Sequence, residues 1–259
     1  MLHKLSIITI NKNNATGLKK TCISVITQTY TDFEWIVIDG ASDDGSVEII
    51  NKYEDKISYW VSEPDMGIYN AMNKGINHAT GEYLLFLNSG DYLIHQWTLE
   101  TIINEINDIK YGDVYYSDVL GDNYFLYKTK KDINIDFFIK NNLNHQNCLI
   151  KRSLFDKELY SENYKIISDN LFFIRMLINY NIVFSYLANP ISFINGNGFS
   201  SNNKSLLRTE KLLILKDLKL TKNNLLLIHN IFIFFKRFFK FIMPYGLYKI
   251  IYTNNINEH

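Results

Sequence analysis

The groups most able to do chemistry in this sequence are carboxylates, amides and hydroxyls that end or follow short apolar runs. They are Thr9 and Asn11, Asp39, Asp65, and the segment Asn88-Ser89-Gly90-Asp91. In an open sheet of parallel strands, ligands bind beyond the carboxyl ends of the strands, where such groups would meet. We therefore expect a polar ligand site at that edge of a sheet.

The chemistry of this edge favours a phosphorylated ligand held through a divalent cation. Carboxylate oxygens bind hard cations and leave coordination positions for phosphate. The sequence contains neither Gly-x-Gly-x-x-Gly nor Gly-x-x-x-x-Gly-Lys. The phosphate loops of dinucleotide-binding and P-loop proteins are therefore not indicated.

Strands and helices alternate in the first half of the chain, which is typical of a mostly parallel sheet with helices on both faces. Strands are predicted at Leu5–Ile10, Glu34–Asp39, Ile57–Val61 and Tyr83–Leu87, and helices at Thr16–Gln28, Ser46–Tyr53 (capped by Ser46) and Ile68–His78. In the second half we predict a hairpin of Asp113–Val119 and Asn123–Lys128, strands at His145–Ile150 and Ile182–Leu187, and helices at Asp169–Tyr180 and Leu206–Leu218. The predicted fold class is α/β.

Composition and charge limit the possible classes of function. The 27 basic residues balance the 27 acidic ones, and a chain without net positive charge is a poor candidate for nucleic-acid binding. Two cysteines, Cys22 and Cys148, are too few for a disulfide framework or a thiolate zinc site, which suits a reducing compartment. No stretch resembles a signal peptide or a spanning helix. We expect a cytoplasmic protein.

Residues 219–259 differ from the rest of the chain. Aromatic residues are interleaved with basic ones from Phe232 to Phe241. Between Leu218 and Asn257 there is no acidic residue, and the basic residues are Lys219, Lys222, Lys236, Arg237, Lys240 and Lys249. Basic and aromatic residues at helical spacing are typical of a helix lying on an anionic membrane surface. We predict an amphipathic helical tail on the inner face of the plasma membrane; a helix packed on the core is the alternative.

Several segments together resemble family 2 glycosyltransferases, which have the GT-A fold. They are Ser6–Asn11, Gln28–Tyr30, Glu34–Ser46 and Gly81–Asp91. The segment Ser62–Gly75 is similar to the branch that builds bacterial surface polysaccharides such as colanic acid and O-antigen. The resemblance covers about residues 4 to 200.

This resemblance implies an inverting transfer of a sugar from a nucleotide-diphosphate sugar to an acceptor hydroxyl. By the family pattern, Thr9, Asn11 and Asp39 bind the nucleotide-sugar. Asp65 and Asn73 are expected at the same edge of the sheet as further contacts, and Ser89 is another candidate contact. Asp91 would hold Mn²⁺ or Mg²⁺, which acts as a Lewis acid on the leaving diphosphate. Asp169, at a predicted helix start, matches the base that takes the acceptor proton.

Further residues are expected on the acceptor or diphosphate side. These are His145 and Gln146, together with Ser200 in a loop over Gly196–Asn203 that would cover the donor and exclude water. Residues 1–218 would form the GT-A domain, with 1–91 as the nucleotide-sugar half and 92–218 as the acceptor half. The tail suggests a lipid-linked saccharide as the acceptor.

Two departures from the family pattern leave other functions open. The metal segment has one carboxylate, Asp91, where several aspartates are common, and Ser168 stands where an acidic residue commonly precedes the base. One alternative is an inactive fold of this type that serves as a scaffold or a carbohydrate-binding protein. Another is a sugar-phosphate nucleotidyltransferase, although Asn11-Lys12-Asn13-Asn14 lacks the glycine-rich basic loop of such enzymes.

Overall fold

The computed structural model describes residues 5–109, 111–121, 124–194 and 202–218. The chain divides into two compact units, Met1–Glu210 and Lys211–His259. The second unit is described only over residues 211–218, which include the end of helix α8 (Lys204–Asp217). The predicted tail of residues 219–259 and the loop residue Ser200 lie outside the described residues.

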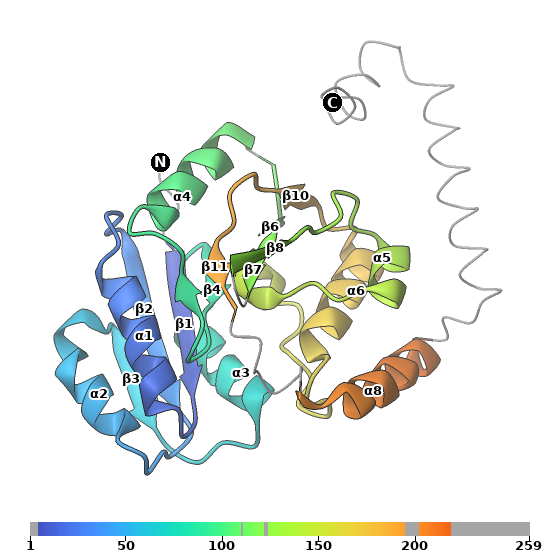
Figure 1. Cartoon of the computed structure of the whole chain (residues 1–259). Coiled ribbons are helices and arrows are strands. Elements are labelled where there is room, and N and C mark those ends of the chain that lie inside the picture. Colours follow the sequence, from blue (N-terminus) through green and yellow to red (C-terminus); the bar gives the residue numbers. More distant parts are fainter. Residues whose placement is uncertain (1–4, 110, 122–123, 195–201, 219–259) are drawn as a thin grey trace, which may run out of the picture. The chain divides into compact units, whose positions relative to one another are not determined.

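A seven-stranded sheet forms the centre of the first unit (Figure 1). Its order is β10-β6-β9-β4-β1-β2-β3, and every neighbouring pair is parallel except those of β9, which is antiparallel to β4 and β6. The strands are β1 (Leu5–Asn11), β2 (Phe33–Asp39), β3 (Tyr59–Ser62), β4 (Tyr83–Phe86), β6 (Val114–Tyr116), β9 (Cys148–Lys151) and β10 (Phe184–Tyr186). Every residue of β1 and β4 is buried, as continuous apolar runs in a covered sheet require. The predicted α/β class is confirmed.

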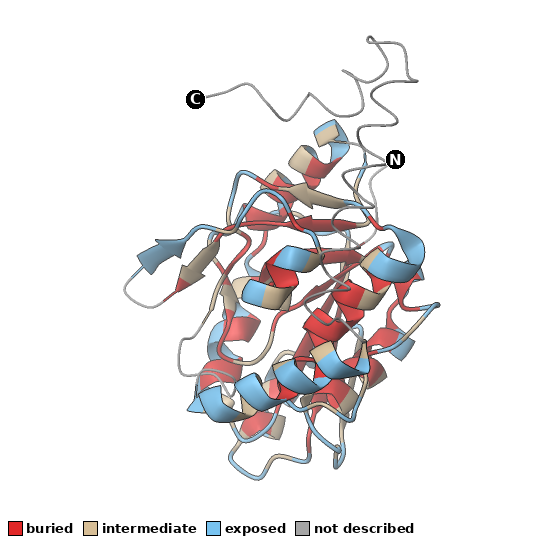
Figure 2. Ribbon diagram, turned by 90° about the vertical axis from the view of Figure 1, so that its right-hand side faces the viewer, coloured by how far each residue is buried: buried red, intermediate tan, exposed pale blue. Residues whose placement is uncertain are grey.

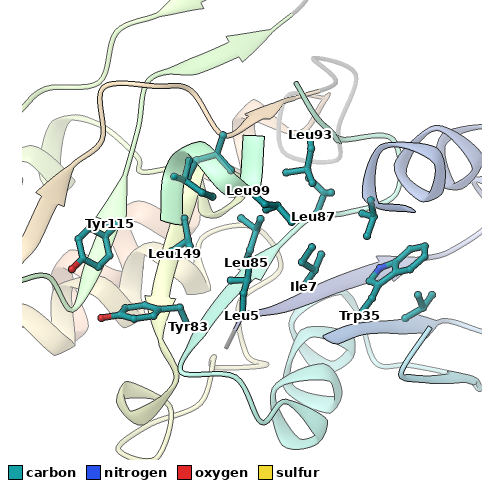
Figure 3. Packing of buried hydrophobic residues seen from close by; sticks show 14 of the residues in the cluster. Leu5, Ile7, Trp35, Tyr83, Leu85, Leu87, Leu93, Leu99, Tyr115 and Leu149 are labelled. Carbon is teal, nitrogen blue, oxygen red and sulfur yellow. The ribbon is translucent and has the colours of Figure 1, made fainter. Parts of the chain in front are cut away.

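One face of this sheet is covered by α1 (Ala15–Ile26), α2 (Ser46–Lys52) and α4 (Thr98–Ile109). Their apolar residues recur every three or four positions, so they lie on one side of each helix. They pack on Leu5, Ile7 and Trp35 of the strands in one buried cluster (Figure 3). The helical members of the cluster are Leu18, Cys22, Val25, Ile50, Leu99, Ile102 and Ile106.

The opposite face is covered by α3 (Ile68–His78) and α6 (Ser168–Tyr180). Helix α3 approaches β1 so closely that a Cβ on Gly75 would lie 2.4 Å from Ile8 Cγ2. Phe172 of α6 stacks on Phe155 at 4.6 Å between ring centroids, and Phe155 meets Phe86 of β4 at 6.1 Å. Figure 2 shows the helices buried on one side and exposed on the other. Both faces are therefore covered, as predicted.

A small four-stranded sheet stands apart from the central one. Its strands are β5 (Tyr92–Leu93), β11 (Ser192–Phe193), β7 (Val119–Gly121) and β8 (Phe125–Tyr127), in that order. Strands β7 and β8 form an antiparallel hairpin in which Gly121 pairs with Phe125. The second strand lies inside the predicted Asn123–Lys128, but the first strand shares only Val119 with the predicted Asp113–Val119. Residues 114–116 of that prediction form β6 in the central sheet, where they are buried and pair with β9 and β10.

Other predictions were corrected near the element ends. Ser46 is the first residue of α2 and not its cap, since Gly45 occupies that position with a φ of +92°. His145–Asn147 form a 3-10 turn before β9. The short helix α5 (Ile135–Lys140) and the 3-10 turns Glu54–Lys56 and Arg152–Leu154 complete the described elements. Within the described ranges, no helix is both long and apolar enough to cross a bilayer.

Candidate active site

Asp39, the last residue of β2, has a fully buried side chain that organises the ends of three neighbouring strands. Its Oδ1 accepts hydrogen bonds from Asn11 Nδ2 (2.7 Å) and Ser42 Oγ (2.6 Å). Its Oδ2 accepts from Ser42 N (2.9 Å) and Ser62 Oγ (2.6 Å). Burial by itself raises the pKa of Asp39, but the bonds from Ser42, Ser62 and Asn11 outweigh it and hold the pKa below its usual value. Asp39 is therefore ionised at neutral pH.

The loop after β2 is tied to the turn after β1. Asn13 N donates to Ser42 Oγ (2.8 Å), and Asp43 N donates to Asn13 Oδ1 (3.0 Å). Asp44 Oδ2 accepts from Ala15 N, the first residue of α1, at 2.8 Å. These bonds fix two polar turns side by side at the carboxyl ends of β1 and β2.

The segment Asn88–Asp91 follows β4 at the same edge. Ser89 N donates to Ile10 O (3.0 Å), and Ser89 O accepts from Asn14 Nδ2 (2.9 Å). Gly90 has a φ of +104°, which glycine adopts without strain, and its N–H donates to Thr21 Oγ1 (3.0 Å). This turn directs Asp91, whose Oδ2 accepts from Gln146 Nε2 at 3.2 Å.

Asp169 lies in the first turn of α6 and is 5% exposed. Its Oδ1 accepts from Tyr69 Oη (3.1 Å) and from the backbone and side-chain nitrogens of Asn170 (2.8 and 3.1 Å). Its Oδ2 lies 2.8 Å from His145 Nδ1, and His145 Nε2 lies 3.1 Å from Asn88 Nδ2. Residues 145 and 146 therefore join Asp169 to Asp91, although these two aspartates are 78 positions apart in the chain.

This arrangement stands in a chain that matches a known family over most of its length. The profile described as Glycosyl transferase family 2 matches residues 6–176. The chain belongs to glycosyl transferase family 2. The match spans β1 through most of α6, and so includes both Asp91 and Asp169.

Relatives of this family 2 glycosyltransferase carry transferase names. A "PGL/p-HBAD biosynthesis glycosyltransferase" of Mycobacterium tuberculosis is 32% identical over 202 residues, which cover 76% of this chain and 78% of the relative. "Glycosyltransferase GlyA" of Streptococcus pneumoniae is 31% identical over 137 residues, 47% of this chain and 20% of the relative.

Solved structures of similar fold have bound nucleotide-sugars. TarS of S. aureus in complex with UDP-GlcNAc has a TM-score of 0.65 at 21% identity, covering 77% of this chain and 61% of the TarS chain. The mannosyltransferase PcManGT of Pyrobaculum calidifontis in complex with GDP-Man and Mn²⁺ has a TM-score of 0.63 at 15% identity, covering 85% and 65%. At these identities the likeness shows the GT-A fold.

Two residues that are predicted to bind the nucleotide-sugar have side chains that form hydrogen bonds inside the fold of this glycosyltransferase. Thr9 is fully buried, and its hydroxyl accepts a hydrogen bond from Trp35 Nε1 (3.0 Å). Asn73 is 6% exposed; its side chain donates to Tyr160 O (2.8 Å) and accepts from Tyr160 N (3.1 Å). Their direct contact with the nucleotide-sugar stays a prediction. Asp65 accepts from Gly67 N (2.9 Å) and is half-buried in the turn before α3.

Tyr69 is a partner of Asp169 that the sequence did not reveal. It is 3% exposed, and its hydroxyl donates to Asp169. Asn88, Ser42 and Ser62 were missed as partners of the predicted aspartates and histidine. The only sequence signal for Tyr69 was its place inside the segment Ser62–Gly75.

Asp91 is the carboxylate of this turn that could hold a divalent cation. Among the residues the structure describes, no group of three or more His, Cys, Asp and Glu side chains could hold a metal ion. Mg²⁺ is commonly bound through one or two carboxylates together with substrate phosphates. The donor set of this glycosyltransferase therefore matches a metal held partly by the substrate, and does not match a metal held by the protein alone.

Proposed function

We propose that this glycosyltransferase transfers a sugar, with inversion, from a nucleotide-diphosphate sugar to an acceptor hydroxyl. The observation that carries the proposal is the linked group Asp91–Gln146–His145–Asp169. It joins a carboxylate suited to the diphosphate side with a second carboxylate suited to proton transfer. The donor complexes of TarS and PcManGT support the choice of a nucleotide-sugar.

Asp169 acts as the general base in this proposal. The acceptor oxygen attacks the anomeric carbon from the face opposite the diphosphate, and its proton passes to the Asp169 carboxylate. The bond from the anomeric carbon to the diphosphate oxygen breaks with its electron pair, and the nucleoside diphosphate leaves. Attack from the opposite face inverts the anomeric configuration.

The other residues bind and orient. Gln146 holds the Asp91 carboxylate, which would bind Mn²⁺ or Mg²⁺ together with the donor diphosphate. The ion would supply Lewis-acid stabilisation of the leaving group. Asp39 holds the turns around Asn11 and Ser42, which would receive the nucleoside. Thus Asp39 acts in nucleotide binding through its neighbours.

The acceptor and location belong to the same proposal. We propose a lipid-linked saccharide of the bacterial surface-polysaccharide type, with residues 1–218 as the transferase domain and residues 219–259 as an attachment to the inner leaflet. Support comes from the similarity of Ser62–Gly75 to that branch and from the basic, aromatic composition of the tail. We propose no nucleic-acid partner, because the chain has a net charge of zero.

Donor hydrolysis and nucleotide binding test the proposal together. UDP-, GDP- and dTDP-sugars are screened with and without Mn²⁺, and bound nucleotide is titrated in parallel. Asp169→Asn should lower turnover by about 10²–10⁴-fold while nucleotide binding survives, because only the base is lost. Asp91→Asn should weaken the Mn²⁺ dependence. Asp136→Asn, an exposed carboxylate on α5, is the matched control.

A carbohydrate-binding scaffold gives a different result in the same assay. It would bind saccharide without hydrolysing any donor, and Mn²⁺ would change nothing. Loss of nucleotide binding in Asp169→Asn would make that residue structural.

A further inference from the structure

The imidazole of His145 lies between two polar groups from separate segments. Nδ1 is 2.8 Å from Asp169 Oδ2, and Nε2 is 3.1 Å from Asn88 Nδ2. The side chains of His145 and Asp169 are 11% and 7% exposed. The ring also meets the edge of Phe86 at 6.2 Å between centroids, so it is fixed by packing as well as by hydrogen bonds.

This geometry determines that the Nδ1 atom of His145 carries the hydrogen that is donated to the Asp169 carboxylate. An ionised carboxylate only accepts hydrogen bonds, so Nδ1 must donate to Asp169. The amide Nδ2 of Asn88 only donates, so Nε2 accepts from it and carries no hydrogen. With the Asn88 amide turned over, Nε2 would donate to Oδ1 instead, and Nδ1 would still donate to Asp169. In both cases His145 is a donor to Asp169.

The two oxygens of Asp169 differ in what they can still do. Oδ1 accepts three hydrogen bonds, from Tyr69 and from both nitrogens of Asn170. Oδ2 accepts one from the residues that the structure describes, namely from His145. A carboxylate oxygen has about two acceptor sites. Oδ2 therefore has room for a further hydrogen, while Oδ1 is crowded.

We propose that His145 is a positioning residue that orients Asp169 so that Oδ2 receives the acceptor proton. The proposal rests on the proposed transfer reaction and names a part for His145 other than contact with the acceptor or the diphosphate. Tyr69 and Asn170 anchor Oδ1, and His145 fixes the rotation of the carboxylate from the other side. Asn88 holds the histidine in turn.

The other ionisable groups that act on this carboxylate are Tyr69 on α3, Cys148 on β9 and Tyr160 before α6. Burial raises the pKa of each well above its usual value, with the charge of Asp169 adding to the effect. All three are neutral at physiological pH. They therefore place no charge beside this carboxylate.

Two substitutions of His145 separate positioning from other roles. His145→Ala removes the donor, and kcat should fall about 10–100-fold, as for other orienting partners of a functional group. The donor KM should change little, because the proposed role of His145 involves no contact with the donor. His145→Asn places an amide N–H near the position of Nδ1, so it should recover most of kcat. His95→Ala, which removes a ring stacked on Trp97, is the control and should change neither.

The outcomes against the proposal are distinct. If His145→Asn is as inactive as His145→Ala while the donor KM is unchanged, His145 itself takes the proton. If both variants lose kcat and donor binding together, His145 is only structural. Either result with an active wild-type enzyme overturns this inference alone, whereas absence of turnover with every donor overturns the proposed function and this inference together.

A separate observation concerns the exposed hairpin strand β8. Four consecutive residues are apolar and open to solvent: Tyr124 (76% exposed), Phe125 (61%), Leu126 (40%) and Tyr127 (53%). Strand β8 is an edge of the small sheet, and edges of this kind are normally blunted by charge or covered. Exposed lysines follow directly at positions 128, 130 and 131, and Asp132 is the exposed acidic residue of the described segment 124–132. We define the β8 patch as Tyr124–Lys128 with Lys130 and Lys131; Figure 2 shows β8 in the exposed colour.

We infer that the β8 patch contacts an anionic lipid bilayer. Tyrosine and other aromatic side chains favour the level of the lipid headgroups. Lysines near an anionic leaflet each contribute about 1 kcal/mol of attraction. This charge complementarity favours a bilayer over a second copy of the chain, which would bring like-charged lysines together.

Vesicle sedimentation of the full chain tests this surface. Binding to vesicles of phosphatidylcholine with phosphatidylglycerol should exceed binding to phosphatidylcholine alone. The double substitution Phe125→Ser and Tyr127→Ser should lower the partition coefficient about tenfold, since it removes much of the apolar area that would be buried in the bilayer. Tyr111→Ser, at a site that is 80% exposed, is the control and should not change it. Unchanged binding in the double variant, or a dimer in solution that the double variant abolishes, would overturn the inference.

Discussion

Asp39 offers the sharpest test of how the candidate site is built, because Asn and Ala substitutions should differ in a way that the hydrogen bonds specify. In Asp39→Ala, the donors on Asn11, Ser42 and Ser62 lose their acceptor in a buried place. The two hydroxyls can turn to other partners, while Ser42 N and Asn11 Nδ2 cannot both do so. Buried donors without a partner cost about 1–3 kcal/mol each, so we expect a loss of about 3–5 kcal/mol in the free energy of unfolding.

Asp39→Asn should lower the free energy of unfolding by less, about 1–2 kcal/mol, because the contact between two amide donors that it creates can be relieved. The new amide would face Asn11 Nδ2, but Asn11 Oδ1 is buried and has no hydrogen-bond partner among the described residues. A turn of the Asn11 amide would place that oxygen against the new donor. The bond of Asn11 Nδ2 to Ser42 Oγ (3.2 Å) would then be lost, which accounts for the remaining cost.

The assay is urea unfolding at several pH values, with nucleotide binding measured alongside. The folded pKa of Asp39 is lowered, whereas the unfolded value is about 3.9. Its stabilisation is therefore complete above the unfolded pKa and is lost as the pH falls through the folded pKa. The gap between wild type and Asp39→Asn should narrow in that window. Equal costs for the Asn and Ala variants, or a gap that widens on acidification, would refute the reasoning.

Three further substitutions probe the contacts behind the site. Gly75→Ala should lower the free energy of unfolding in urea by about 1–2 kcal/mol, because its Cβ would meet the buried Ile8 side chain at 2.4 Å. This cost should exceed the gain from the helix preference of alanine. A more stable variant would show that α3 can move away from β1. Glu210→Ala removes the acceptor for Lys165 N (2.8 Å) and Ile166 N (3.0 Å) just before α6. The free energy of unfolding should fall by about 2 kcal/mol, and kcat should fall by a larger factor than the donor KM changes. An unaffected kcat would show that these bonds do not position Asp169. Tyr69→Phe removes the hydrogen bond to Asp169 Oδ1, so kcat should fall about tenfold while nucleotide affinity stays unchanged. Steady-state kinetics and nucleotide titration measure the two quantities. A loss of affinity with unchanged kcat would contradict this role of Tyr69.

Local patterns in the sequence predicted the elements well where one pattern dominated. The helix predicted at Ile68–His78 matches α3 at both ends, and the apolar runs of β1, β2 and β4 were found to within one residue. The edge that would carry the polar groups followed from the alternation of strands and helices. Strand β6 was predicted wrongly, since a three-residue strand carries too little periodicity to be told from the adjacent hairpin. Helices α4 and α5 were not predicted.

The sequence by itself determined the fold class, the family, and the prediction that Asp39, Asp91 and Asp169 matter. Tertiary structure alone decided what each side chain binds. Thr9 and Asn73 have the residue types of ligand contacts, but packing gave their polar atoms to Trp35 and Tyr160. Tyr69 and Asp169 are 100 positions apart, and no local rule links them. The physical reason is that periodicity reports which face of an element is buried, while a hydrogen bond depends on which distant segment the folded chain brings within about 3 Å.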